Sequence, residues 1–178
     1  PLVGTAPTNN GFIGIGTDYV RKTGLAGNGS TKYLSSNRNN NADPQDNKHL
    51  AVYLTATSTG SKCPIGSGGA VTGNSQIIQN TTGSGVTFRI NLTSGASATT
   101  ADLTTGLTGA SRASSASVNW RISSLSGIYT DTSQSPQNAI VDVFRRSGGT
   151  LYSDQTIAFY SIGESLDLAL LDARVTAL

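Results

Sequence analysis

Few side chains of this chain have the chemistry for catalysis. Its 178 residues include one histidine, His49, and one glutamate, Glu164. A Ser-His-Asp triad would have to use His49 as its base, because catalysis of this type needs an imidazole oriented by a third group. The serine-rich sequence contains no Gly-x-Ser-x-Gly elbow that follows a strand and opens a helix. We therefore expect no catalytic serine.

Paired carboxylates are the second catalytic possibility. Retaining glycosidases place two carboxylates about 5 Å apart, and inverting ones about 6.5–9.5 Å apart. Because Glu164 stands where a helix would begin, only aspartate pairs remain, such as Asp43 with Asp46 or Asp142 with Asp154. Polysaccharide hydrolysis is therefore the third and least favoured function, and we expect that the chain is not an enzyme.

Metal and nucleotide chemistry have little support in the sequence. Zinc sites need clusters of Cys and His, whereas Cys63 is the only cysteine. Cys63 cannot form an internal disulfide, so the fold does not depend on an oxidising compartment. The glycines at 11, 14 and 16 lack the order of a dinucleotide-binding loop. We expect no cofactor.

A polar stretch at residues 35–48 (SSNRNNNADPQDNK) predicts an exposed loop and the best candidate binding site. Amides offer donor and acceptor together, carboxylates accept, and arginine donates in a fork, as sugar hydroxyls require. The candidate glycan-binding residues are Asn37, Arg38, Asn40, Asp43, Asp46 and His49.

Two other interpretations of this stretch stay open. The loop can be held by internal Asx-turns, with Asp43 and Pro44 beginning a turn. Asp43 and Asp46, together with amide oxygens, could instead hold Ca²⁺, which takes six to eight oxygens. The EF-hand order is absent because no glycine occupies the sixth position, so Ca²⁺ is the weaker alternative.

Composition predicts the elements that must position these side chains. Hydrophobic residues make up 36% and charged residues 12%, and the net charge is only +2. Disorder usually combines low hydrophobicity with high net charge, whereas many Thr, Ser and Gly suit strands joined by tight turns. There are enough large apolar residues for one sandwich core and not for two domains.

Alternation of apolar and polar residues locates the strands. Residues 49–57 place Leu50, Val52 and Leu54 on one side, and residues 86–92 alternate in the same way. Further candidate strands are 31–34, 75–79, 85–92, 117–122, 127–129, 139–145 and 155–162. Trp120 shares its parity with Val118 and Ile122, which favours the core over a sugar-stacking platform. Many short strands without a helix until the end predict an all-β antiparallel sandwich.

The C-terminal segment predicts a helix. Ser161 and Glu164 fit the Ser-x-x-Glu capping box, and residues 165–178 are rich in helix formers. One stripe comprises Leu166, Leu170, Ala173 and Ala177. The other has an a/d-type spacing and is the candidate oligomer interface, formed by Leu168, Leu171, Val175 and Leu178. Two apolar faces on one helix predict that one packs on the sandwich and the other on a partner subunit.

These patterns divide the chain into three parts: a linker or N-terminal arm at 1–10, a β-sandwich domain at 11–163 and a C-terminal helix at 164–178. The chain has no Met and begins PLVGTAPT, which suggests a processed product or a piece of a longer polypeptide. The Lys and Arg residues are scattered, so we expect no nucleic-acid binding. No apolar run approaches the ~20 residues of a membrane span, so we expect no membrane insertion.

Several segments together resemble concanavalin A-like, laminin-G-type sandwich domains. Residues 28–34 (NGSTKYL) resemble the family's Gly-Ser-x-x-Tyr-Leu opening, and the strand at 50–54 (LAVYL) follows at the usual distance. Residues 156–164 (TIAFYSIGE) resemble its late strand and turn. The resemblance covers roughly residues 11–178 and implies a jelly-roll sandwich. The family's Ca/Mn-binding lectin motif is not recognisable, so no sugar-binding residue is carried over.

With residues 36–46 (SNRNNNADPQD) and 165–178 (SLDLALLDARVTAL), the chain is also similar to domains at the ends of bacteriophage virion proteins. That similarity implies a structural viral protein on the virion surface, in a tail, fibre or head (capsid) decoration protein. Such a module would be a homo-oligomer, with a trimer favoured, contacting other virion subunits. The first functional hypothesis is a lectin-like module that binds host-surface glycan, and the alternative is a purely structural assembly module without a ligand.

Overall fold

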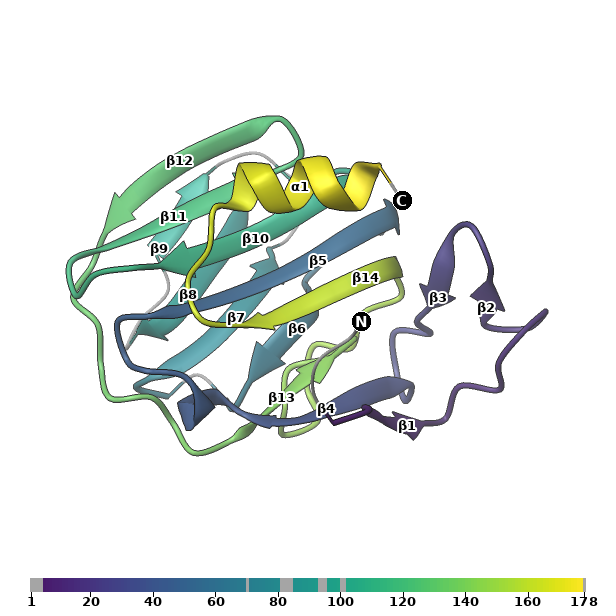
Figure 1. Cartoon of the computed structure of the whole chain (residues 1–178). Helices are drawn as coiled ribbons and strands as arrows, with labels where there is room; N and C mark the ends of the chain where they lie inside the picture. Colours follow the sequence, from purple (N-terminus) through teal and green to yellow (C-terminus); the bar gives the residue numbers. More distant parts are fainter. Residues whose placement is uncertain (1–4, 70, 81–84, 93–95, 100–101, 178) are drawn as a thin grey trace.

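The computed structural model is an antiparallel β-sandwich of two sheets with one short C-terminal helix (Figure 1). It describes residues 5–69, 71–80, 85–92, 96–99 and 102–177. Within this described part each sheet has seven strands. The first sheet has the order β1 (Thr8–Asn10), β4 (Tyr33–Asn39), β13 (Ile140–Val143), β6 (Lys62–Ser67), β7 (Asn74–Gln79), β8 (Val86–Leu92) and β9 (Ala96–Thr99).

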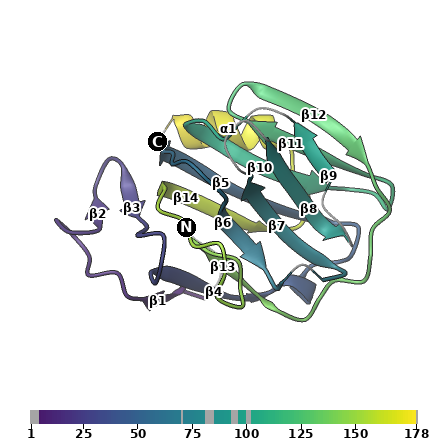
Figure 2. The same ribbon diagram turned by 180° about the vertical axis from the view of Figure 1, so that it is seen from behind.

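The second sheet lies against the first and carries the helix on its outer face, as the view from behind also shows (Figure 2). Its order is β12 (Leu125–Thr130), β11 (Ser117–Ile122), β10 (Gly106–Arg112), β5 (Lys48–Ala56), β14 (Thr156–Gly163), β3 (Gly24–Ala26) and β2 (Tyr19–Val20). A short 3₁₀ turn, η1 (Asn40–Ala42), follows β4. Among the described residues no helix is long and apolar enough to cross a membrane.

The core lies between the two sheets, where the predicted alternation is confirmed. Leu50, Val52 and Leu54 of β5 are fully buried in it. They meet apolar side chains of the first sheet such as Phe88 and Ile90 of β8. Burial of these faces supplies the main driving force for joining the sheets.

Trp120 packs against the core, as its parity predicts. Its ring stacks on Phe88 with centroids 6.0 Å apart and an interplanar angle of 15°. Gly127 lies opposite Trp120 on β12, and a Cβ there would come within 2.6 Å of the indole. The glycine therefore makes room for the ring at the edge of the sheet.

Two central strands were not predicted, β6 and β10. β6 (KCPIGS) contains Pro64 and β10 (GLTGASR) contains Gly109, both of which lower strand propensity. Gly109 is nevertheless required, because the helix packs directly over it. A Cβ at Gly109 would lie 2.8 Å from Leu168 Cδ2 and 3.2 Å from the carbonyl oxygen of Leu50.

The predicted capping box is wrong. Ser161 belongs to β14, where it pairs with Ala51 of β5, so its backbone cannot begin a helix. The helix α1 runs over Leu168–Thr176 and is capped by Asp167. The Asp167 carboxylate accepts hydrogen bonds from the backbone N–H groups of the second and third residues that follow, at 2.8 and 3.2 Å.

Candidate functional site

More than half of the predicted exposed loop at 35–48 is regular structure, so that prediction is wrong for residues 35–42 and for Lys48, the first residue of β5. Strand β4 continues to Asn39, and η1 follows it. β4 lies between β1 and β13 in the first sheet, and this pairing satisfies its backbone despite its polar side chains. The remaining residues turn at Pro44, whose carbonyl accepts a hydrogen bond from the Asn47 N–H at 3.1 Å.

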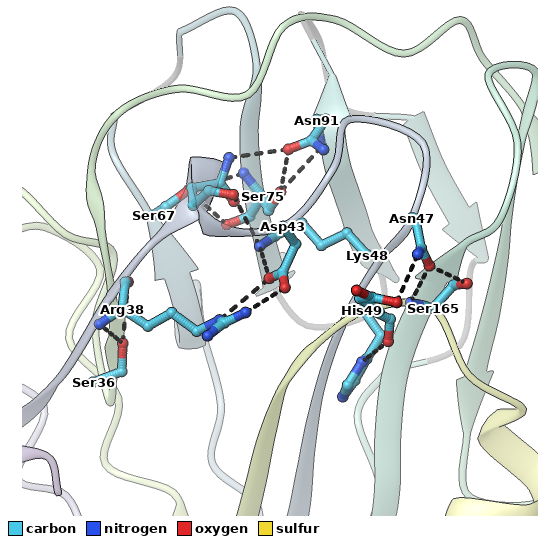
Figure 3. A network of polar contacts seen from close by, with 12 residues as sticks. Ser36, Arg38, Asp43, Asn47, Lys48, His49, Ser67, Ser75, Asn91 and Ser165 are labelled. Carbon is cyan, nitrogen blue, oxygen red and sulfur yellow. Dashed lines mark hydrogen bonds and ion pairs between the residues drawn. The ribbon is translucent and has the colours of Figure 1, made fainter. Parts of the chain in front are cut away.

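Asp43 is the centre of a buried ionic cluster after η1 (Figure 3). Lys48 places its ammonium 3.1 Å from Asp43 Oδ2, and Arg38 contacts both carboxylate oxygens. The Lys48 side chain is fully buried, and Nζ also donates to the Asn40 carbonyl at 3.0 Å. Burial alone would raise the pKa of Asp43, but the hydrogen bonds and charges of Arg38 and Lys48 lower it overall. Asp43 is therefore a structural carboxylate.

Asn40 is fully buried and ties this cluster to the first sheet. Its amide nitrogen donates to the Gly73 carbonyl at 2.8 Å and to Asn91 Oδ1 at 3.0 Å. Asn91 also accepts from the Ser75 hydroxyl at 3.0 Å and donates to the Gln45 carbonyl at 2.8 Å. These contacts hold the 40–47 segment across the end of the sandwich. Asn40 Oδ1 has no hydrogen-bond partner among the described residues, but the side chain is fully buried and out of reach of an external ligand.

Asn37 and Asp46 also form contacts within the chain. Asn37 donates to the Ala6 carbonyl at 2.9 Å and to the Thr8 hydroxyl at 3.0 Å, which fastens the strand β1 beside β4. Asp46 accepts from the Ser133 hydroxyl. Asn37 remains exposed, and Asp46 is half-buried. The structure therefore brings the six predicted residues to one end of the sandwich, largely as internal bracing.

His49 is buried beside the end of β14. Its Nδ1 lies 2.6 Å from the Glu164 carbonyl oxygen, and its Nε2 lies 2.7 Å from the Ser161 hydroxyl. Because a carbonyl only accepts, Nδ1 carries the proton and Nε2 accepts from Ser161. Burial lowers the pKa of His49, so the neutral ring is favoured. Ser161 lies inside a regular strand and not on the sharp turn that exposes a nucleophilic serine.

The carboxylates offer no ready-made metal centre. No group of three or more His, Cys, Asp or Glu side chains that could hold a metal ion occurs among the described residues. For Ca²⁺, Asp43 would have to exchange its two cationic partners for the ion. The second pair from the sequence is likewise engaged, because Asp142 pairs with Arg145 at 2.8 Å and Asp154 with Lys62 at 3.2 Å.

The helix turns one of its two apolar stripes toward its own sheet. Leu168 is 6% exposed and packs over Gly109, while Leu171 and Val175, on the same side, are half-buried. Leu178 lies outside the described residues. Leu170, on the other stripe, is 60% exposed. The stripe that remains open to a partner is thus the one that begins at Leu166.

A groove on the outer face of the second sheet was not predicted. It has a volume of about 470 Å³ and lies where the C-terminal half of α1 meets β5 and the turn between β11 and β12. Its lining consists of Tyr53, Leu54, Thr55, Thr105, Gly106, Arg121, Ser123, Ser124, Asp172 and Thr176. A second hollow of about 400 Å³ shares Arg121, Asp172 and Thr176 and continues along the alanines of α1.

An ion pair between sheet and helix divides these two hollows. Arg121 donates through Nε and Nη2 to Asp172 Oδ2, at 2.8 and 2.6 Å. Thr176 donates to the other oxygen, Oδ1, at 3.3 Å. Both side chains are partly exposed, at 19% and 16%. The groove therefore offers hydroxyl groups, the paired guanidinium and carboxylate of Arg121 and Asp172, and the side chain of Tyr53.

No sequence signal marks this site, because Arg121 and Asp172 lie 51 residues apart and meet only when the helix docks. Comparison with family models, with curated proteins and with solved structures found no match to this chain. The groove, the buried cluster and the exposed surface are therefore the observations from which function must be argued.

Proposed function

We propose that this chain is a β-sandwich module on the outside of a bacteriophage particle that binds host-surface glycan without catalysis. It would form part of a fibre, tail or head-decoration protein, with other virion subunits as partners. The groove beside α1 is the observation that carries the glycan assignment. The phage setting rests on the resemblance of the sequence to concanavalin A-like virion domains.

The chemistry of the groove suits a carbohydrate. Sugar hydroxyls both donate and accept, and the groove combines donors and acceptors on Ser123, Ser124, Thr55 and the Arg121–Asp172 pair. Tyr53 adds an apolar ring with a polar tip, which suits the mixed surface of a sugar. An open, partly hydrated groove favours weak binding, for which several copies on one particle supply avidity.

The residues predicted from sequence are less suited to this role. Asn40, Asp43 and His49 are buried, with internal partners for most of their polar atoms. A ligand that replaced those partners would leave Lys48 buried without its carboxylate, which is costly. We therefore propose the groove as the glycan contact and assign no part of it to Asn37 or Arg38, which belong to β4 of the first sheet.

The alternative is a structural assembly module that binds no ligand. The observation in its favour is the outward stripe of α1, where Leu170 is 60% exposed. In that case the helix would contact sister subunits, with a trimer favoured. The two proposals differ in whether groove residues or the outward face of the helix control what the protein binds.

A glycan-array screen with groove variants tests the first proposal. Ser124→Arg fills the groove, whereas Thr130→Arg adds the same charge to an exposed position at the other end of β12, opposite Ser117 and away from the groove. We expect Ser124→Arg and Tyr53→Ala to weaken glycan binding by about tenfold or more, since each removes roughly 1–2 kcal/mol of contact. Thr130→Arg should bind as the parent does.

Two outcomes would contradict the glycan assignment. One is a parent protein that binds no glycan even when displayed in multiple copies. The other is equal loss of binding in Ser124→Arg and Thr130→Arg, which would place the contact elsewhere. Released sugar in the same assay would contradict the absence of catalysis.

A further inference from the structure

Residues 11–23 project from one side of the sandwich. They are called the arm from here on and do not include the N-terminal segment 1–10. Figures 1 and 2 show the β2–β3 hairpin, which forms the edge of the second sheet, and the segment before it extending to one side of the other strands. The arm is joined to the second sheet through β3, which pairs with the beginning of β14 at Leu25–Ile157 and Ala26–Thr156, and through the Thr55 hydroxyl of β5, which donates to the Thr23 carbonyl. It is therefore the part of the described chain best placed to meet an extended external surface.

The arm exposes large apolar side chains to an unusual degree. Ile13 is 77% exposed, Ile15 88% and Val20 56%. All three lie within eight residues of the chain, whereas scattered single exposed residues need no explanation. Elsewhere on the second sheet Ile128 of β12 is 69% exposed, which provides a matched position outside the arm.

The fold holds these side chains outward rigidly. Phe12 is buried and packs against Phe144, with ring centroids 5.0 Å apart. The Ile13 N–H donates to the Asp18 carboxylate at 2.7 Å. The Gly14 carbonyl accepts from three successive backbone N–H groups, those of residues 17 to 19, at 3.1–3.3 Å. These contacts hold the backbone of the arm in a conformation that leaves Ile13 and Ile15 exposed.

The charge of the arm is positive. Arg21 and Lys22 are exposed at the turn of the hairpin, and no ion pair involves either of them within the described chain. The one acidic residue of the arm, Asp18, is buried and neutralised by Lys32 at 2.5 Å. An apolar tip with two unpaired cations is complementary to an apolar layer beneath negative headgroups.

We propose that the arm docks on the surface of an anionic lipid bilayer, with Ile13 and Ile15 entering the boundary between headgroups and acyl chains. Arg21 and Lys22 contact lipid phosphates, and the sandwich stays outside. This is peripheral attachment and not a membrane span. It is independent of the glycan groove, which lies on the outer face of the second sheet beside α1. A module with both features would hold a glycan-bearing cell surface at two chemically different points.

Vesicle co-sedimentation of the full chain tests this inference. The probes are phosphatidylcholine vesicles and vesicles of phosphatidylcholine mixed with phosphatidylglycerol, at low and high salt. We expect binding to the anionic vesicles that weakens with salt, and little to the neutral ones. Arg21→Gln with Lys22→Gln should reduce partitioning by roughly 30-fold, because each cation contributes about fivefold near such a surface.

The apolar contribution has its own variants. Ile13→Ser with Ile15→Ser removes apolar contact without changing charge and should reduce binding more than about tenfold, while Ile128→Ser, also exposed but outside the arm, should leave it unchanged. The proposal is overturned by absent binding to anionic vesicles, or by binding that survives the double Ser variant. It is also overturned if light scattering shows an oligomer that the double Ser variant dissociates, because the arm would then be an interface with a second copy.

Discussion

At the scale of single residues, the most informative feature is the number of charged and amide side chains inside the sandwich. Lys48 and Arg112 face each other on neighbouring strands β5 and β10, and both are fully buried. Lys48 is compensated by Asp43, whereas Arg112 donates to backbone carbonyls, including those of Ile90 and Asp131. Each cation is satisfied by groups from another part of the chain, so these contacts fix how loops cross the end of the sandwich.

Asp43 and Arg38 belong to the same ionic cluster, but their substitution should lower the free energy of unfolding by different amounts. Asp43→Asn keeps the shape of the side chain but leaves the buried Lys48 without a carboxylate, so we expect a loss of about 3–5 kcal/mol of unfolding free energy. Arg38→Gln removes a cation whose side chain is 42% exposed, so it should cost about 1 kcal/mol or less. Urea denaturation of both variants measures the difference, and equal losses would contradict it.

At the scale of elements, the helix and β10 depend on one another. Gly109 has no side chain where Leu168 lies, so a strand that looks weak by propensity is the one that the helix can cover. The ion pair of Arg121 and Asp172 then fixes the other end of α1 on β11. The groove exists because the helix is docked in this position.

A larger side chain at position 109 of β10 should release the helix from the sheet without unfolding the sandwich. Gly109→Val places methyl groups against Leu168 and the Leu50 carbonyl, whereas Gly69→Ala adds a methyl where nothing lies within 4 Å. We expect trypsin to cut at Arg174 of α1 much faster in Gly109→Val than in the parent, because the docked helix resists unfolding locally. Cleavage at the parent rate, or the same acceleration in Gly69→Ala, would show that helix docking does not depend on Gly109.

At the scale of the whole molecule, the most exposed large apolar side chains come from three different parts of the described chain. Leu170 projects from α1, Ile128 from β12, and Ile13 and Ile15 from the arm. The lipid contact proposed for the arm does not involve α1, so it can coexist with either of the other two proposals. Glycan binding and assembly through α1 would compete, because Ala173 and Ala177 of the outward stripe line the hollow beside the groove.

Light scattering of the full chain separates assembly from ligand binding. If the outward stripe of α1 joins sister subunits, the protein is an oligomer, with a trimer favoured, and Leu170→Asp converts it to a monomer. Ile128→Asp, which changes an equally exposed residue, should leave the mass unchanged. A monomeric parent protein would remove the support for assembly through α1. Glycan binding in the groove would then be the better-supported function.

The sequence by itself determined the class of fold, because alternation with a period of two reports directly which face of a strand is buried. It located β5, β8 and β11 closely and placed Trp120 toward the core. It also indicated a helix at the C-terminus, since helix formers and two apolar stripes are local properties. The phage origin and the glycan function implied by resemblance remain proposals.

Tertiary structure alone decided where the polar residues went. The run at 35–48 resembles a solvated loop because its composition is polar, yet Asn40 and Asp43 are buried by partners such as Asn91 and Lys48. A sequence pattern records polarity and not the hydrogen bonds that satisfy it. The groove around Arg121 was likewise beyond local patterns, because its walls come from strands and a helix far apart in the chain. Strand pairing and helix docking, which depend on long-range packing, are what assembled both.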